Sequence, residues 1–183
     1  IALFMYSFGY GGITSFVPLY ARDSGTRPVG IYFLVFAATM VCTRPFVGRI
    51  ADRMGRRRIL IPCLALICLG LSLLAVSGTF WMLVASAIIF GLGFGSAYPS
   101  FAAMILDRID SHRHGAAYGS ILLAFDTGIG SGSVVTGLLA QHYGFHVAYG
   151  ATAALAFFSI PYFLFTEKSM EGEPADPSGS AVA

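Results

Sequence analysis

Apolar residues along the chain gather in six long runs that short polar breaks separate. A helix that crosses a membrane needs about 20 apolar residues, because each residue adds ~1.5 Å of rise. Each run meets this length, so the pattern predicts an all-α membrane protein with six transmembrane helices over residues 1–165. The predicted spans are Ile1–Tyr20, Gly30–Val47, Ile59–Val76, Phe80–Leu106, Ala116–Ala140 and Phe145–Phe165.

The polar breaks between these runs are predicted to be loops. They cover Ala21–Val29, Gly48–Arg58, Ser77–Thr79, Asp107–Gly115 and Gln141–Gly144. From Thr166 the composition shifts to Glu, Gly, Pro, Ser and Ala, which cannot bury enough apolar surface to fold. The sequence therefore predicts a disordered tail over residues 166–183.

Composition agrees with a surface that faces lipid. Hydrophobic residues make up 56% of the chain and charged residues 11%, against about 25% charged in soluble domains. The net charge of +2 and the lack of a basic helix face argue against nucleic acid as a partner. The three cysteines lie in apolar runs without metal-ligand spacing, so neither a metal nor a cofactor is expected. Because Ile1 already lies inside an apolar run, we expect that the chain was cut from a longer protein.

The distribution of Lys and Arg predicts the orientation. If the first helix enters from the cytoplasm, eight basic residues fall in cytoplasmic segments and two in outer loops. The eight are Arg49, Arg53, Arg56, Arg57, Arg58, Arg108, Arg113 and Lys168; the two are Arg22 and Arg27. By the positive-inside rule both chain ends are cytoplasmic, in what we expect to be a bacterial plasma membrane.

The break after the second run carries the most specific motif. Residues 48–58 read GRIADRMGRRR, with Gly48, Asp52 and Gly55 at fixed spacing and basic residues at Arg53, Arg57 and Arg58. Gly48 would let two helix ends approach closely, and Gly55 would permit a turn with positive φ. This loop resembles the signature loop of the major facilitator superfamily at every defined position.

The resemblance covers the chain up to Thr166 and implies a fold and a function. Members of this family have twelve spans in two halves, so the six spans would be one half, and the first helix and the tail are more similar to the C-terminal half. Family membership implies a secondary active transporter that moves a small solute by alternating access, with the other six-helix half and the lipid bilayer as partners. Proton-coupled efflux is one mode the family uses.

In the family, the signature loop acts as a latch between helices of opposite halves. By analogy, Arg53 or Arg57 would pair with Asp107 or Asp110 at the end of the fourth helix, and Asp52 would accept from free N–H groups at a helix N-terminus. The alternative is that the arginines only fix the topology.

A short sequence pattern that occurs in both the first and the fourth predicted helix suggests two inverted three-helix repeats. Phe8-Gly9-x-Gly11 in the first helix corresponds to Phe90-Gly91-x-Gly93 in the fourth. Two glycine-rich helices could also match by chance, so both interpretations stay open.

Asp126 is the main candidate for chemistry. It lies about ten residues into the fifth predicted helix and hence ~15 Å deep, where a carboxylate is costly and usually functional. Proton carriage and a structural pairing with Arg44 are the two alternatives. Arg44 itself is expected about one turn inside the cytoplasmic end of the second helix, where it would extend to the surface, pair with Asp126 or bind an anionic substrate.

Polar residues on the first and fourth helices are candidates for a cavity lining. They are Tyr6, Tyr10, Ser15, Ser96, Tyr98 and Ser100. The Gly91/Gly95 and Gly128/Gly132 pairs have the spacing of close helix contacts, and packing is the favoured interpretation for them. The histidines His112, His114, His142 and His146 are expected at the surface.

Two other function classes remain as alternatives. One is a non-transporting membrane scaffold or an inactive truncated product. The other, more remote, is an intramembrane serine protease, in which Ser131 would act with His142 or His146. Enzyme activity is otherwise not expected.

Overall fold

The computed structural model describes residues 1–23, 30–107 and 109–171, with the side chains at 51–54, 56–57, 111 and 167–171 left out of the description. These residues form six α-helices and one short 3-10 turn, and no strand occurs among them. The helices are α1 (Ala2–Asp23), α2 (Gly30–Met54), α3 (Arg56–Ala75), α4 (Phe80–Leu106), α5 (His114–Tyr143) and α6 (Phe145–Glu171).

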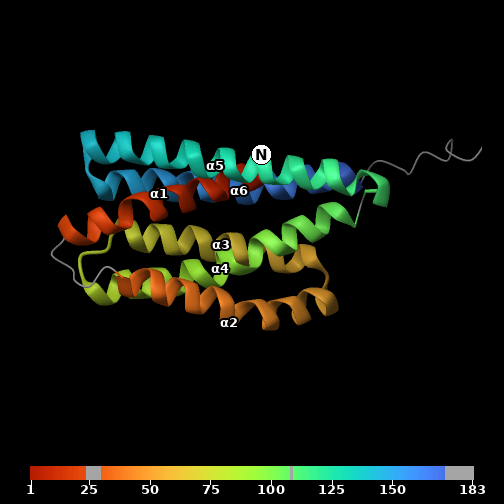
Figure 1. The fold of residues 1–183 in the computed structure, drawn as a ribbon, viewed down its shortest axis with the longest axis horizontal. Coiled ribbons are helices and arrows are strands. Elements are labelled where there is room, and N and C mark those ends of the chain that lie inside the picture. The colour runs from red at the N-terminus through yellow and green to blue at the C-terminus, as the bar shows by residue number, and fades with distance from the viewer. Residues whose placement is uncertain (24–29, 108, 172–183) are drawn as a thin grey trace, which may run out of the picture.

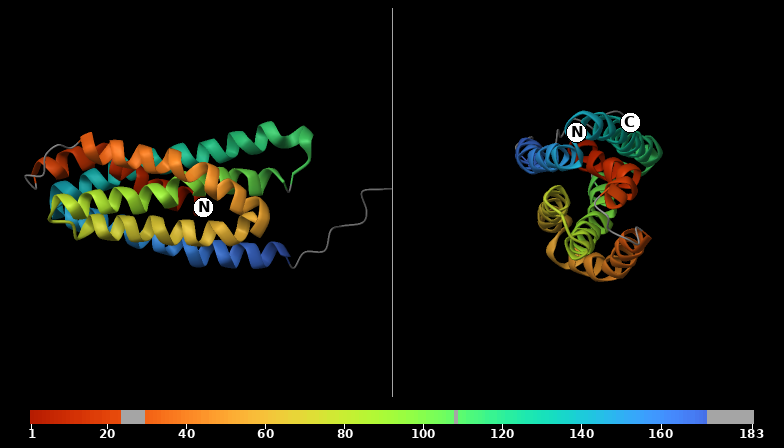
Figure 2. Two further views of the ribbon diagram at one scale, coloured as in Figure 1. Left: turned by 90° about the horizontal axis from the view of Figure 1, so that it is seen from below. Right: turned by 90° about the vertical axis from the view of Figure 1, so that its left-hand side faces the viewer.

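The six helices lie side by side in one bundle, and each helix runs in the opposite direction to the one before it (Figure 1). α1 packs against α5 and α6, α2 packs against α4, and α3 lies against both α4 and α6. Viewed along the helix axes, α2 and α5 are the two flanks of one side of the bundle, with α1 and α4 between them (Figure 2); this side is called the open side below. Among the described residues, five helices, all except α1, are long and apolar enough to cross a membrane by length and composition.

The sequence located the helices well and the loops less well. α4 begins and ends at the predicted residues. The predicted loop Gly48–Arg58 is wrong, because α2 continues to Met54 and α3 begins at Arg56. Most residues of this segment are good helix formers, so the helix continues after the apolar run has ended.

Gly55 is the one residue between α2 and α3, and its φ of 88° lies in the left-handed region. A residue with a side chain is strained there, so the predicted turn function of Gly55 is confirmed. Gly48 behaves differently from the expectation. It is exposed on α2, and no atom of the described structure lies within 4 Å of where its Cβ would be, so it makes no close helix contact within this chain.

α6 extends to Glu171, six residues beyond the predicted end of the last span. Residues 172–183 lie outside the described residues, so the disordered tail remains a prediction there. The ends of α5 also reach further than the sequence indicated, from His114 to Tyr143.

Glycines bring α1 and α5 into close contact. A Cβ at Gly132 would collide with the backbone of Phe8, and one at Gly11 would collide with the backbone of Ile129. Gly128 similarly faces Ser7 and the backbone of Phe4. The packing interpretation of the Gly128/Gly132 pair is therefore confirmed.

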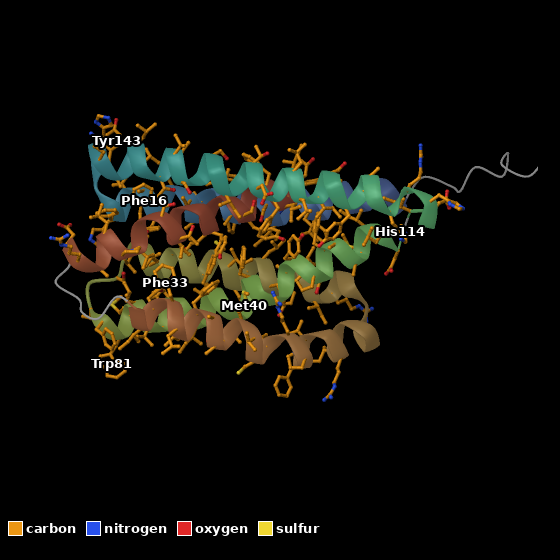
Figure 3. All side chains as sticks on the ribbon, viewed as in Figure 1. Phe16, Phe33, Met40, Trp81, His114 and Tyr143 are labelled. Carbon is orange, nitrogen blue, oxygen red and sulfur yellow. The ribbon has the colours of Figure 1, made fainter. Side chains whose placement is uncertain are left out.

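The glycines of α4 contact two neighbours at once. Gly91 and Gly95 face α2, where a Cβ at Gly95 would lie 2.6 Å from Cγ of Met40 (Figure 3). Gly93 faces α3, where a Cβ would lie 2.6 Å from the carbonyl oxygen of Cys63. Small residues on two faces of α4 thus let α2 and α3 pack directly on its backbone.

The contacts that α1 makes with α5 and α6 are repeated in the contacts that α4 makes with α2 and α3. α1 against α5 corresponds to α4 against α2, and α1 against α6 corresponds to α4 against α3. This arrangement is typical of inverted three-helix repeats. The repeated Phe-Gly-x-Gly pattern does not explain this correspondence of contacts, because Gly9 faces Leu71 of α3 whereas Gly91 faces α2.

The two ends of the bundle differ in their side chains. Trp81 and Tyr143, which are 76% and 69% exposed, lie at one end, whereas His114 lies at the other, which is also the end of the turn between α2 and α3 (Figure 3). Trp and Tyr are enriched where membranes meet water, so the aromatic end and the arginine-rich end fit opposite membrane surfaces.

Candidate functional site

The open side of the bundle is formed by helices that the rest of the chain leaves uncovered. In the apolar stretch of α2 only 11% of the residues are buried, and in α5 22%, against 56% in α4. α2 and α5 are thus apolar helices with little of their surface packed inside this chain. The surface between them is the candidate site.

An array of aromatic rings from four helices forms the floor between these flanks. Tyr10 of α1 stacks on Phe94 of α4 with ring centroids 4.4 Å apart, and Phe36 of α2 lies 5.9 Å from Tyr10. Phe94 also lies 6.0 Å from Phe125 of α5, which contacts Tyr98 at 4.7 Å. Tyr10, Tyr98 and Phe125 are partly buried, whereas Phe36 and Phe94 are buried, so only the first three rings are accessible on this side.

Serine hydroxyls join α1 to α5 through hydrogen bonds. Oγ of Ser15 donates to Oγ of Ser133 at 2.9 Å, and Oγ of Ser133 lies 3.0 Å from the carbonyl oxygen of Gly11. Ser15 is exposed and Ser133 is partly exposed, so these hydroxyls are accessible from the open side.

Asp126 lies on α5 seven residues before Ser133, and residues at this spacing share one helix face. Its side chain is exposed and within electrostatic range of Tyr98, whose hydroxyl is in hydrogen-bonding range of Tyr118. Asp126 is the 13th residue of the 30-residue α5, near the middle of that helix. The structure thus places the carboxylate beside the aromatic floor.

Arg44 does not lie near a helix end. α2 continues ten residues past it to Met54, so the expectation of a position one turn from the end is wrong. Arg44 follows Phe36 and Met40 at four-residue spacing and therefore lies on the stripe of α2 that meets the floor. It is exposed, and no ion pair joins it to Asp126 among the described side chains.

Three of the predicted cavity residues face the interior of the bundle instead. Tyr6, Ser96 and Ser100 are buried, and the hydroxyls of Tyr6 and Ser96 have no hydrogen-bond partner among the described atoms. Sequence spacing could not separate them from Tyr10 and Tyr98, because α1 and α4 are glycine-rich and apolar around most of their circumference.

The predicted latch is described only in part. The backbone of Asp52, Arg53 and Arg57 belongs to α2 and α3, but these side chains lie outside the described residues. Asp107 and Asp110 are exposed between α4 and α5, at the same end of the bundle as Gly55. The pairing of these groups stays a prediction.

The histidines and Ser131 are engaged separately. Nδ1 of His146 lies 2.6 Å from the carbonyl oxygen of Ala75, and Nε2 of His114 lies 2.9 Å from that of Ile109. Oγ of Ser131 donates to the backbone of its own helix at Thr127, and His142 lies eleven residues further along α5, ~16 Å away by helical rise. Ser131 therefore has no hydrogen-bonded histidine in the described structure, and no group of metal ligands occurs there.

The aromatic floor and Ser133 were missed in the sequence. Phe90 and Phe94 lie four residues apart on one stripe of α4, which is a signal that the sequence contains. What the sequence cannot show is that rings from α1, α2 and α5 meet this stripe.

Comparison with known proteins gives one family. The model of the Major Facilitator Superfamily matches residues 1–181. An uncharacterized MFS-type transporter of Pseudomonas aeruginosa is 28% identical over 75% of this chain and 34% of its own length. The quinolone resistance protein NorA of Staphylococcus aureus is 29% identical over 85% of this chain and 41% of its own length.

Solved structures show the same fold. A peptide transporter POT, crystallised with sulfate, superposes with a TM-score of 0.82 at 22% identity over 97% of this chain and 40% of its own. A bacterial homologue of the human drug peptide transporters PepT1 and PepT2 superposes with a TM-score of 0.79 at 15% identity, covering 44% of that protein. The chain thus spans less than half the length of the relatives it matches.

Proposed function

Because this chain belongs to the major facilitator superfamily and is a multi-pass integral membrane protein of six-helix half-bundle fold, we propose that it is one half of a secondary active transporter. The transporter moves a small solute by alternating access, and this chain is the C-terminal half. A second six-helix half is its partner.

The uncovered flanks carry this proposal. α2 and α5 are apolar along their length but only 11% and 22% buried within this chain. Arg44 lies on α2 and Asp126 lies on α5, and lipid would be a costly environment for either charge. A second half that packs on α2 and α5 would remove both charges from lipid and enclose the aromatic floor as a path.

Proton-coupled efflux is the mode that we propose for the path. Alternating access exposes a group in the middle of the membrane first to one side and then to the other. In this proposal Asp126 accepts a proton from outside and releases it inside, while the solute moves outward. The signature loop between α2 and α3 acts as the conformational latch, with Asp107 and Asp110 as partners of its arginines.

We place the protein in a bacterial plasma membrane with the arginine-rich end in the cytoplasm. The exposed Trp81 and Tyr143 at the opposite end then lie at the outer surface. Both ends of the chain are cytoplasmic in this arrangement.

A membrane scaffold or an inactive truncated product is the second candidate. The protease alternative has lost its support, because Ser131 donates to its own helix and His146 to Ala75.

The decisive experiment is reconstitution of the full-length gene product in sealed vesicles. A proton gradient is imposed, and uptake and efflux of a solute panel are recorded. Gradient-dependent movement of at least one solute, abolished by a protonophore, is the expected result. Vesicles that move no member of the panel, in either direction and with or without a gradient, would favour the scaffold.

A further inference from the structure

Two tyrosines, Tyr98 of α4 and Tyr118 of α5, join their helices close to Asp126. The hydroxyl of Tyr98 is in hydrogen-bonding range of that of Tyr118 and within electrostatic range of the Asp126 carboxylate. The ring of Tyr98 packs on Phe125 at a centroid distance of 4.7 Å, and Phe125 directly precedes Asp126 on α5. Tyr98 is therefore the group between Tyr118 and Asp126.

The three groups also lie in order along the bundle. α4 ends and α5 begins at the arginine-rich end, where His114 lies (Figure 3). By helical rise, Tyr118 is ~6 Å from the start of α5, Tyr98 is ~12 Å from the end of α4, and Asp126 is ~18 Å from the start of α5. The two tyrosines thus lead from the middle of α5 toward the arginine-rich end.

The space between α4 and α5 at this end is otherwise largely apolar. A pocket of about 330 Å³ lies there, lined by side chains such as Phe101 and Ile105 of α4 and Ile121 of α5. Ser120 is the one polar residue in its described lining, and Oγ of Ser120 donates to the carbonyl oxygen of Ala116 in the same helix at 3.0 Å. A proton is costly in such surroundings unless polar groups hold it. The tyrosine pair offers a polar connection between Asp126 and this end of the bundle.

From this arrangement we propose that Tyr98 and Tyr118 form a proton relay between Asp126 and water at the cytoplasmic end. The relay rests on the proposed function, in which Asp126 carries the proton and the arginine-rich end is cytoplasmic. Tyr118 is exposed, so its hydroxyl can reach water, whereas Tyr98 is partly buried between the helices.

The transfer conserves protons and charge. Protonated Asp126 gives its proton, through one bridging water molecule, to the oxygen of Tyr98, while the hydroxyl proton of Tyr98 moves to the oxygen of Tyr118. The hydroxyl proton of Tyr118 moves at the same time to a cytoplasmic water molecule. Asp126 is left as the carboxylate, each tyrosine again has one proton, and the cytoplasm has gained one proton. Because the shifts are concerted, neither tyrosine has to become charged in the membrane.

Tyr6 of α1 is a neighbour of Tyr98 that lies outside this relay. It is within electrostatic range of Tyr98, but it is fully buried, and its hydroxyl has no hydrogen-bond partner among the described atoms. Its position leads into the bundle core rather than to water. Tyr6→Phe is therefore the matched control, since it removes a hydroxyl close to Tyr98 without breaking the proposed route.

Removing one oxygen atom at a time tests the relay. Tyr98→Phe and Tyr118→Phe keep the rings and lose only the hydroxyls. The full-length protein is placed in sealed vesicles with trapped pyranine, a pH-sensitive dye, and proton movement is recorded together with the panel solute that the vesicle assay identifies. Exchange of that solute between equal concentrations is measured in the same preparations.

We expect each of the two variants to slow proton-driven transport about tenfold or more and to leave exchange within about twofold of the wild-type rate. Positioned groups contribute roughly 10²- to 10⁴-fold to proton transfer, and water replaces part of this contribution. The variants should also slow further in D₂O than the wild type does, because proton transfer has become the limiting step. Tyr6→Phe should keep the wild-type ratio of driven transport to exchange.

The outcomes separate the relay from the proposed function. Loss of driven transport in Asp126→Asn, with wild-type rates in both tyrosine variants, would overturn the relay alone. An equal loss of driven transport and exchange would show that the hydroxyls have a structural role, and a loss in Tyr6→Phe as large as that in Tyr98→Phe would show that the route is wrong. Wild-type vesicles without any proton-driven transport contradict the proposed function, and the relay with it.

Discussion

Oγ of Ser133 in α5 donates a hydrogen bond to the carbonyl oxygen of Gly11 in α1, at 3.0 Å. This bond forms across a helix contact so close that neither Gly11 nor Gly132 has room for a Cβ. The two helices are therefore held in one register, in which Ser15 and Asp126 come to the open side.

The first prediction concerns Gly132 in this contact. Gly132→Ala places a methyl group on the backbone of Phe8, which cannot move without shifting α1. We expect a loss of about 1–3 kcal/mol of stability, as for overpacked cores. This loss should appear as a lower midpoint of thermal unfolding in detergent. Gly130→Ala is the control, because a Cβ at Gly130 meets no atom within 4 Å. If the two variants unfold at the same temperature, the α1–α5 contact is looser than described.

The second prediction concerns the turn at Gly55. Gly55→Ala forces a side chain into a conformation with φ of 88°, which costs on the order of 1–3 kcal/mol. We expect a lower unfolding midpoint and altered transport, since the turn positions the signature loop. Gly48→Ala in the same segment should leave the unfolding midpoint unchanged or raise it, because Gly48 is helical and a Cβ there meets no atom within 4 Å. An unperturbed Gly55→Ala protein would contradict the strain argument.

The third prediction tests the orientation. In a background without native cysteines, Gln141→Cys should react with a membrane-impermeant maleimide added to intact cells, because Gln141 is exposed near the end that carries Tyr143. Arg113→Cys, exposed at the opposite end, should react only after the membrane is opened. The reverse pattern of labelling would invert the topology.

The fourth prediction concerns Asp52 in the signature loop. Asp52→Asn should slow transport and shift the balance of inward-open and outward-open states without reducing the amount of protein in the membrane. The physical reason is that an uncharged amide interacts less strongly with helix N-terminal N–H groups and arginines. Cysteine accessibility from each side, recorded with and without substrate, measures the balance. Normal kinetics in this variant would leave the arginines as topology signals only.

The fifth prediction concerns Asp126 as the proton carrier. Asp126→Asn should abolish gradient-driven transport, whereas exchange between equal concentrations of saturating substrate should persist, because exchange needs no net proton transfer. Counterflow in vesicles with and without a pH gradient separates the two activities. Asp23→Asn serves as a control carboxylate outside the path. Gradient-driven transport at the wild-type rate in the Asp126→Asn protein would exclude Asp126 as the carrier.

The sequence predicted some helix limits correctly and others not, because hydropathy and local residue signals report different properties of the chain. The limits of α4 were predicted to the residue because its apolar run is bounded by a capping threonine, Thr79, and by Asp107. The limits of α2 were not, because hydropathy reports where the lipid ends, whereas the helix ends where the backbone must turn, at Gly55. That error also placed Arg44 near a helix end instead of well inside α2.

The sequence by itself determined that this protein is a bundle of apolar helices with a signature loop, since apolar run length and local spacing are properties of consecutive residues. Only the tertiary structure decided which faces meet. It turned Tyr6 and Ser96 inward, brought Tyr10, Phe36, Phe94 and Phe125 into one floor, and put Arg44 and Asp126 on opposite flanks. The reason is that α1 and α4 are apolar on most sides, so their rotation is set by close glycine contacts with α5, α2 and α3 rather than by a hydrophobic stripe.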